Sequence, residues 1–159
     1  IYSKNDKILI STEHGPKGGD EINLIKITDN KISNYGWPIS SYGSHYDIVP
    51  YNSHTKKYAP LHKSHLEHGF EEPIYFFNES IGISEIIKNY KKDNVFFVTS
   101  LKDQSIYEIE FDENLNFKKI LNKLEIKERI RDIIYDSNSE CYYIYGDTTP
   151  KIISMCNKN

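Results

Sequence analysis

The only two arginines of the chain lie two residues apart, in the segment "KERIRD". The sequence of 159 residues holds 20 lysines and arginines, and only Arg129 and Arg131 are arginines. At the spacing of a β-strand both side chains point to one face, where two guanidinium groups repel each other unless they meet anions. Arginine binds a carboxylate through two parallel hydrogen bonds, which lysine cannot do. The pair therefore indicates either a ligand with several carboxylates or ion pairs with Glu128, Asp132 or other nearby acids.

A glycine-rich loop in the segment "EHGPKGGDEINL" (13–24) is the second feature that could carry chemistry. The loop is longer than a usual hairpin turn. Its three glycines permit positive φ, and Pro16 makes the turn rigid. Such a loop can direct carbonyl oxygens inward, which is how proteins bind calcium. Asp20 and Glu21 either bind the cation or order the loop by accepting backbone N–H groups; the alternative is a long hairpin with a solvated acidic corner.

Three weaker signals involve a lysine, histidines and the single tryptophan. Lys102, in "SLKDQS", lies in a tight loop between two predicted strands and is either a ligand contact or an ordinary exposed lysine. His62, His65 and His68 are spaced for a transition metal only if they lie on a helix; we expect solvated loop histidines instead. For Trp37, in "NYGWP", we expect an aromatic plug under a long loop.

Composition limits the class of protein. Hydrophobic residues make up 38% of the chain, the mean hydropathy is −0.62 and the formal net charge is −3. This balance argues against a membrane span and against a nucleic-acid surface. Cys141 and Cys156 either form a disulfide or remain two buried free thiols. The chain shows no signal peptide and does not begin with Met, so we expect a fragment of a longer protein.

Short segments rich in β-branched and aromatic residues, bounded by Gly, Asn, Asp or Pro, predict an all-β fold. They lie at 7–12, 22–27, 73–77, 95–100, 106–111, 131–136, 141–146 and 151–155. Residues 116–130 carry apolar side chains at helix-like intervals, but a strand with a loop is favoured there. Residues 34–72 show almost no strand pattern, and an irregular segment of this length is usually functional or disordered.

Three strand pairs share one plan, in which a strand, a loop and a second strand follow each other. They are "KILIST-EHGPKGGDE-INLIKI", "VFFVTS-LKDQS-IYEIEF" and "CYYIYG-DTTPK-IISM". A repeat of about 40 to 50 residues built from antiparallel strands is typical of propeller blades, and a β-sandwich is the alternative. Three blades do not close a ring. We therefore expect a single domain over 1–159 that needs either a missing propeller half or a second copy in a homodimer.

Taken in order, several motifs resemble one family, the soluble quinoprotein sugar dehydrogenases, also called the glucose/sorbosone dehydrogenase family. The motifs are "EHGPKGGDEINLI", "NYGWPISSYG", "GFEEPIYFFNESIGIS", "SLKDQSIYEIEF" and "ERIRDI". The resemblance covers nearly the whole chain and corresponds to the C-terminal half of the family. It implies a partial six-bladed β-propeller of about three blades. It also implies oxidation of aldose sugars at C1 with pyrroloquinoline quinone (PQQ) and calcium, and a periplasmic or secreted location.

The resemblance implies roles for residues in and near the glycine-rich loop. Gly15 and Pro16 match a Gly-Pro pair whose backbone carbonyls bind the calcium, and His14 matches a contact to the cofactor. Ser80 matches a small hydroxyl residue near the cofactor. Some relatives hold a second calcium after the "NYGWP" motif, for which Asp47 is the candidate.

The cationic residues match contacts to the carboxylates and oxygens of PQQ. Lys102, Arg129 and Arg131 are these residues, and three positive charges suit a cofactor with three carboxylates. Two departures from the family pattern concern the pocket. The catalytic base of the family is a histidine in the first half of the propeller, and none of the six histidines here matches it. Glu79 stands where proline is usual in the family.

Two hypotheses for the function follow. In the first, the chain is part of a PQQ-dependent sugar dehydrogenase and supplies cofactor and calcium contacts but no catalytic residue, so the isolated chain is inactive. In the second, the chain is part of a non-catalytic propeller that binds a protein or an acidic sugar, since one fold supports many functions. A metal protein that depends on the three histidines is a third and weaker interpretation.

Overall fold

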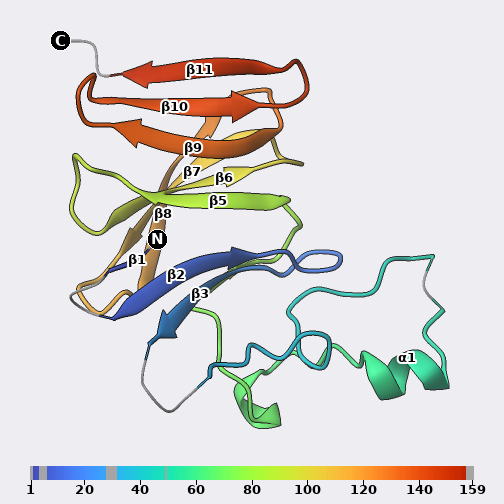
Figure 1. The fold of residues 1–159 in the computed structure, drawn as a ribbon. Coiled ribbons are helices and arrows are strands. Elements are labelled where there is room, and N and C mark those ends of the chain that lie inside the picture. Colours follow the sequence, from blue (N-terminus) through green and yellow to red (C-terminus); the bar gives the residue numbers. More distant parts are fainter. Residues whose placement is uncertain (1, 4–6, 28–31, 49, 157–159) are drawn as a thin grey trace. The chain divides into compact units, whose positions relative to one another are not determined.

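The computed structural model describes residues 2–3, 7–27, 32–48 and 50–156. The chain divides into two compact units, residues 1–81 and residues 82–159. Both units contain antiparallel sheets, the helices of the described residues are short, and the predicted all-β class is confirmed (Figure 1). Within the described part of the chain, no helix is both long and apolar enough to cross a membrane. A single domain over 1–159 stays a prediction.

The first unit contains a four-stranded antiparallel sheet in the order β1-β2-β3-β4. Its strands are β1 (Tyr2–Ser3), β2 (Ile8–Glu13), β3 (Asp20–Lys26) and β4 (Tyr75–Phe77). β2 and β3 form the predicted hairpin, which ends with Glu13 opposite Glu21. Alternation along the strands buries Ile10 and Ile22 on the same face. The pairing leaves residues 14–19 as the connecting loop.

The predicted irregular segment between β3 and β4 contains two short helices. They are α1 (Ser53–Tyr58) and η1, a 3-10 helix (Leu66–His68). α1 begins after Asn52, whose side chain accepts hydrogen bonds from the backbone of His54 and Thr55. The rest of the segment is held by tertiary contacts, such as the ring of Tyr42 stacked on Phe76 with centroids 3.7 Å apart. The segment is therefore irregular but packed.

The second unit contains two antiparallel sheets, in the orders β5-β6-β7-β8 and β11-β10-β9. The first has β5 (Ile83–Lys88), β6 (Val95–Ser100), β7 (Ser105–Phe111) and β8 (Phe117–Glu125). The second has β9 (Ile130–Asp136), β10 (Cys141–Gly146) and β11 (Lys151–Cys156). The two other predicted hairpins are β6–β7 and β10–β11, and β8 is a strand as favoured from the sequence.

The core of the second unit lies between its two sheets, which pack against each other in Figure 1. Phe97 and Ile106 from one sheet meet Ile133, Tyr142 and Ile144 from the other. Burial of such side chains stabilises the unit by roughly 1.5–3 kcal/mol each. A disulfide joins β10 to β11 between the two cysteines, so the disulfide alternative is confirmed.

Candidate functional site

The glycine-rich loop between β2 and β3 is fixed by two neighbouring segments of the first unit. Lys17 and Ser44 exchange backbone hydrogen bonds, both of 3.0 Å, and the N–H of Gly19 donates to the carbonyl of Phe77 at 2.8 Å. Gly19 has a φ of +70°, and a Cβ atom there would lie 2.1 Å from the nitrogen of Gly43. Only glycine fits this position, because other residues add both strain and a clash.

Asp20 orders this loop from inside the protein. Its carboxylate is completely buried, Oδ1 accepts the N–H of Gly15 and Oδ2 accepts the N–H of Ile81, both at 2.9 Å. The Nδ1 atom of His14 lies 3.9 Å from Oδ1. Of the two predicted roles for Asp20, the structure shows the ordering of the loop. Because Ser80 directly precedes Ile81, the same carboxylate brings the predicted residues His14, Gly15 and Ser80 to one place.

The outer side of the loop is exposed to solvent at His14. The side chain of His14 is 57% exposed. A cavity of about 10 Å³, room for about one water molecule, is lined by residues that include Glu13, His14, Gly15 and Trp37. Trp37 is 55% exposed, so the expectation of a buried aromatic plug is wrong. The indole lies at the rim of this cavity because the "NYGWP" segment folds back along β2 and β3.

Beneath the loop lies a buried polar cluster that the sequence did not predict. Glu21 Oε1 lies 3.4 Å from Nε2 of His65, and both side chains are buried. Burial, with the nearby charges of Glu13 and Glu72, raises the pKa of Glu21 to about 7. The ring of Tyr42 stacks on His65. The expectation of a solvated His65 is therefore wrong, because Tyr42 and β3 enclose it.

The remaining candidates for metal binding have other partners. The Asp47 carboxylate is 87% exposed and forms an ion pair of 2.7 Å with Lys17. The rings of His62 and His68 stack with centroids 3.7 Å apart. Among the described residues, no group of three or more His, Cys, Asp or Glu side chains could hold a metal ion.

In the second unit, both arginines contact a single carboxylate. Arg129 Nε lies 3.3 Å from Asp147 Oδ1, and Arg131 Nε donates a hydrogen bond to Oδ2. The prediction that the two arginines share a face is confirmed. Their acidic partner is Asp147 from the β10–β11 turn rather than Glu128 or Asp132. Two positive charges face one negative charge, and the guanidinium side chains are 45% and 51% exposed, so this cluster keeps an excess of positive charge at the surface.

The backbone around this cluster is held by the same turn. The N–H of Asp147 donates to the carbonyl of Arg129 at 2.9 Å. Glu128, which was a candidate partner of the arginines, accepts hydrogen bonds from Lys151 and Thr149 instead, and these lower its pKa to about 2. Glu128 therefore stays ionised and fixes the β10–β11 turn that carries Asp147.

Lys102 lies at the same end of the strands of the second unit. It occupies the β6–β7 loop, and the backbone N–H of Leu101 donates to the carbonyl of Gly82 just before β5 at 2.7 Å. Ser84 of β5 donates to the carbonyl of Ile130 at the start of β9 at 2.6 Å. The Lys102 side chain is exposed and forms no ion pair with any residue that the structure describes. One end of this unit therefore carries Lys102 on its loop, Arg129 just before β9 and Arg131 as the second residue of β9.

A family model and two relatives each match most of the chain. The family model described as Glucose / Sorbosone dehydrogenase matches residues 1–154. The chain is 26% identical over 157 residues to Aldose sugar dehydrogenase YliI of Escherichia coli (strain K12), covering 92% of this chain and 38% of that protein. It is 25% identical over 152 residues to Uncharacterized protein slr1608 of Synechocystis sp. (strain ATCC 27184 / PCC 6803 / Kazusa), covering 91% of this chain. The chain spans 38% and 33% of the lengths of these relatives.

Solved structures share the fold. A glucose dehydrogenase superposes with a TM-score of 0.76 at 21% identity, covering 99% of this chain and 43% of that chain. The soluble aldose sugar dehydrogenase of Escherichia coli in its apo-form superposes with a TM-score of 0.70 at 23% identity, covering 92% of this chain and 40% of that chain.

Proposed function

The chain belongs to the glucose/sorbosone dehydrogenase family, and from this premise we propose that it is part of a quinoprotein sugar dehydrogenase that oxidises aldoses at C1. The three sheets would form about half of a six-bladed β-propeller. The chain would supply contacts to PQQ and calcium, and the catalytic base would come from outside it. The observation that carries the proposal is the exposed arginine pair, whose charge exceeds that of its single acidic partner.

The cationic cluster suits a cofactor with three carboxylates. Arg129 and Arg131 would hold carboxylates through their exposed N–H groups, since each uses Nε for Asp147. Lys102 would add a third positive charge from the neighbouring loop. When bound, PQQ accepts the hydride that leaves C1 of the sugar. The role of Asp147 would be to orient both guanidinium groups before the cofactor arrives, which reduces the cost of binding.

The glycine-rich loop suits a cation that binds backbone oxygens. Gly15 and Pro16 would supply their carbonyls to calcium, and His14 and Ser80 would contact the cofactor beside it. Asp20 is completely buried and already accepts two backbone N–H groups, so it would support the loop and leave the calcium to the carbonyls. Calcium binds such mixed oxygen ligands readily.

A periplasmic or secreted location is part of the proposal. The disulfide between Cys141 and Cys156 supports it, because structural disulfides persist in oxidising compartments and are rare in the reducing cytosol.

Calorimetric titration of PQQ into the purified chain, with calcium or with EDTA, tests the proposal. We expect binding that requires calcium and is lost in the double variant R129A/R131A. The matched control is K118A/K119A, which removes two exposed cations that pair with Glu110 on β7 and should keep full binding. Binding that persists without both arginines would refute their role. The chain alone should oxidise no aldose, even with PQQ and calcium.

A specific observation supports the alternative of a non-catalytic binding module. Asp147 already provides both arginines with an anion. In this alternative the pair is a structural bridge beneath a surface for a protein or an acidic sugar. In that case R129A/R131A would lower the melting temperature strongly, because Asp147 would lose both partners. A near-normal melting temperature together with lost PQQ binding would favour the enzyme.

The proposal also requires the other half of the six-bladed propeller ring. Either a propeller half that this chain lacks or a second copy in a homodimer would cover the terminal sheets, as uncapped repeats require. Light scattering distinguishes the two, since the chain alone has a mass of 18.6 kDa. A dimer mass would favour the second copy.

A further inference from the structure

A second pocket lies in the second unit, at the end of the strands opposite to the arginine pair. It is formed by the turn after β5, the turn before β10, and parts of β6, β7, β10 and β11. β6 begins beside it and ends at the Lys102 loop, whereas β10 begins beside it and ends next to Asp147. Its volume is about 250 Å³. Within the second unit, the pocket is thus separate from Lys102 and the arginine pair.

The floor of this pocket is apolar. The rings of Phe97 and Tyr142 meet edge to face with centroids 5.1 Å apart, and Met155 completes the floor. The Tyr142 hydroxyl accepts the N–H of Tyr90 at 2.8 Å and donates to the carbonyl of Lys88 at 3.2 Å. Because the hydroxyl is already engaged, Tyr142 offers a ligand only its ring.

One wall of the pocket is polar, and its opposite charges are paired. Glu108 is buried and accepts hydrogen bonds from Asn89 Nδ2 at 3.2 Å and from Lys92 Nζ at 2.8 Å. The side-chain oxygen of Asn89 accepts the backbone N–H of Lys91 at 3.0 Å. Glu108 therefore offsets the charge of Lys92, and these contacts shape the wall of the pocket.

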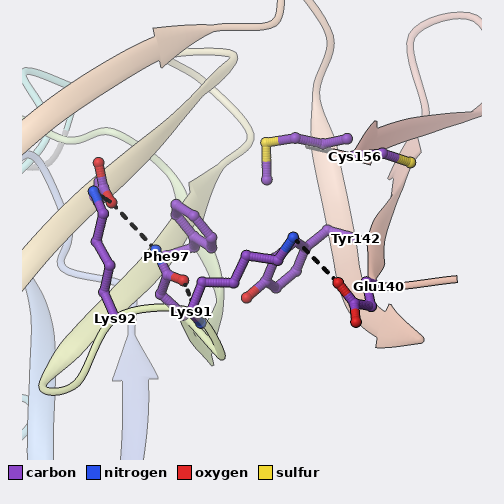
Figure 2. A pocket seen from close by; sticks show the side chains of 9 residues that line it. Lys91, Lys92, Phe97, Glu140, Tyr142 and Cys156 are labelled. Atoms are coloured by element: carbon purple, nitrogen blue, oxygen red, sulfur yellow. Dashed lines mark hydrogen bonds and ion pairs between the residues drawn. The ribbon is translucent and has the colours of Figure 1, made fainter. Parts of the chain in front are cut away.

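Lys91 is the cation at the mouth whose charge is least engaged. Figure 2 shows its extended side chain directed toward Glu140, and the two charged groups lie 3.9 Å apart. This separation exceeds hydrogen-bond length, and the Glu140 side chain is 72% exposed. An exposed ion pair of this kind contributes only about 0–1 kcal/mol. A carboxylate bound in the pocket would therefore replace Glu140 at little cost.

We propose that this Lys91 pocket binds a small carboxylate that carries one apolar ring. The ring would lie on Phe97, Tyr142 and Met155, and the carboxylate would meet the ammonium group of Lys91. The volume lies just below the range of about 300–1,000 Å³ that is usual for drug-sized ligands, which fits a single ring. A polyhydroxylated sugar acid fits poorly, since the apolar floor offers no hydrogen-bond partner for its hydroxyl groups.

Titration of phenylacetate into the full chain, followed by amide chemical shifts in NMR spectra, tests the proposal. We expect saturable binding with shifts centred on the β5–β6 turn and on β10 and β11. Lys91→Glu should weaken the affinity at least tenfold, and Met155→Trp, which fills the floor, should do the same. Lys119→Glu on the exposed strand β8 is the matched control and should change the affinity less than twofold. Melting curves of all variants show whether each one is folded.

Two further probes and one variant complete the test. Gluconate and phenethylamine should not bind at the same concentrations, because one lacks the ring and the other lacks the carboxylate. The R129A/R131A variant should bind phenylacetate normally, whatever its affinity for PQQ. The proposal is overturned if phenylacetate does not bind, if Lys91→Glu leaves the affinity unchanged, if either other probe binds equally well, or if the arginine variant loses the binding.

Discussion

The two groups of candidate residues are held in place by different kinds of interaction. In the first unit, the β2–β3 loop is positioned by a buried carboxylate and by close backbone contacts that only glycine permits. In the second unit, the arginine pair lies on the surface and is positioned by one shared ion pair. The loop should therefore be inseparable from the folding of its unit, whereas the arginines should be replaceable without unfolding the protein.

The largest effect on stability is expected for Asp20→Ala. Two backbone N–H groups, that of half-buried Gly15 and that of buried Ile81, would lose their acceptor. At roughly 1–3 kcal/mol for each unsatisfied group, the free energy of unfolding should fall by about 4 kcal/mol. Urea denaturation measures this loss. Asp47→Ala is the matched control in the same unit, because Asp47 is exposed and should cost less than about 1 kcal/mol. Equal losses would contradict the comparison.

Gly19→Ala should lower the free energy of unfolding by slightly less, about 3 kcal/mol. The new Cβ would lie 2.1 Å from the nitrogen of Gly43, so the loop would have to move. Gly69→Ala separates strain from the clash, because Gly69 also has positive φ but a Cβ there meets nothing within 4 Å. Strain alone should cost about 1 kcal/mol. If both alanine variants lose the same stability in urea, close packing does not hold the loop.

The buried acid beneath the loop should make stability depend on pH. Burial raises the pKa of Glu21 from 4.5 to about 7 in the folded chain. Between these values the unfolded chain releases a proton that the folded chain keeps, so the free energy of unfolding falls as pH rises from about 4.5 to about 7. The fall should reach about 3 kcal/mol at most and should vanish in Glu21→Gln. Urea denaturation across this range in EDTA measures it, and an unchanged slope in the variant would contradict the assignment.

The smallest effect is expected for the arginines. Arg129→Ala and Arg131→Ala should each lower the free energy of unfolding by less than about 1 kcal/mol, because both side chains are half-exposed and share their ion pair. Thermal melts measure this directly. A loss above about 2 kcal/mol in either variant would erase the difference between the two regions and favour the structural role of the pair.

Much of the fold could be predicted from local patterns, and the exceptions have physical reasons. The three hairpins carry runs of β-branched and aromatic residues, and all three are present. β5 was not predicted because Ile83, Ile86 and Ile87 are spaced as on a helix. A bulge between Ile83 and Ile86 breaks the alternation there. The short helix α1 buries none of its residues, so it leaves no apolar pattern to detect.

The candidate site was predictable in its residue types and less so in its partners. The glycines and the two arginines stand out locally, and the family resemblance that they indicated is confirmed by the match over residues 1–154. The partner of Asp20, Ile81, lies 61 residues away, and Asp147 lies 16 residues from Arg131. No local sequence pattern indicates that such distant residues are partners. The burial of His65 likewise depends on Tyr42, which folds over it from a distant segment.

The disulfide between β10 and β11 has a consequence for how the last strand pairs. β11 is the outer strand of its sheet, and Cys141 lies directly opposite Cys156. A slip of one residue would turn Ile153 and Met155 away from the core, but the covalent bond permits a single register. The bond therefore prevents a strand of another chain from replacing β11, which is the usual hazard at an exposed sheet edge.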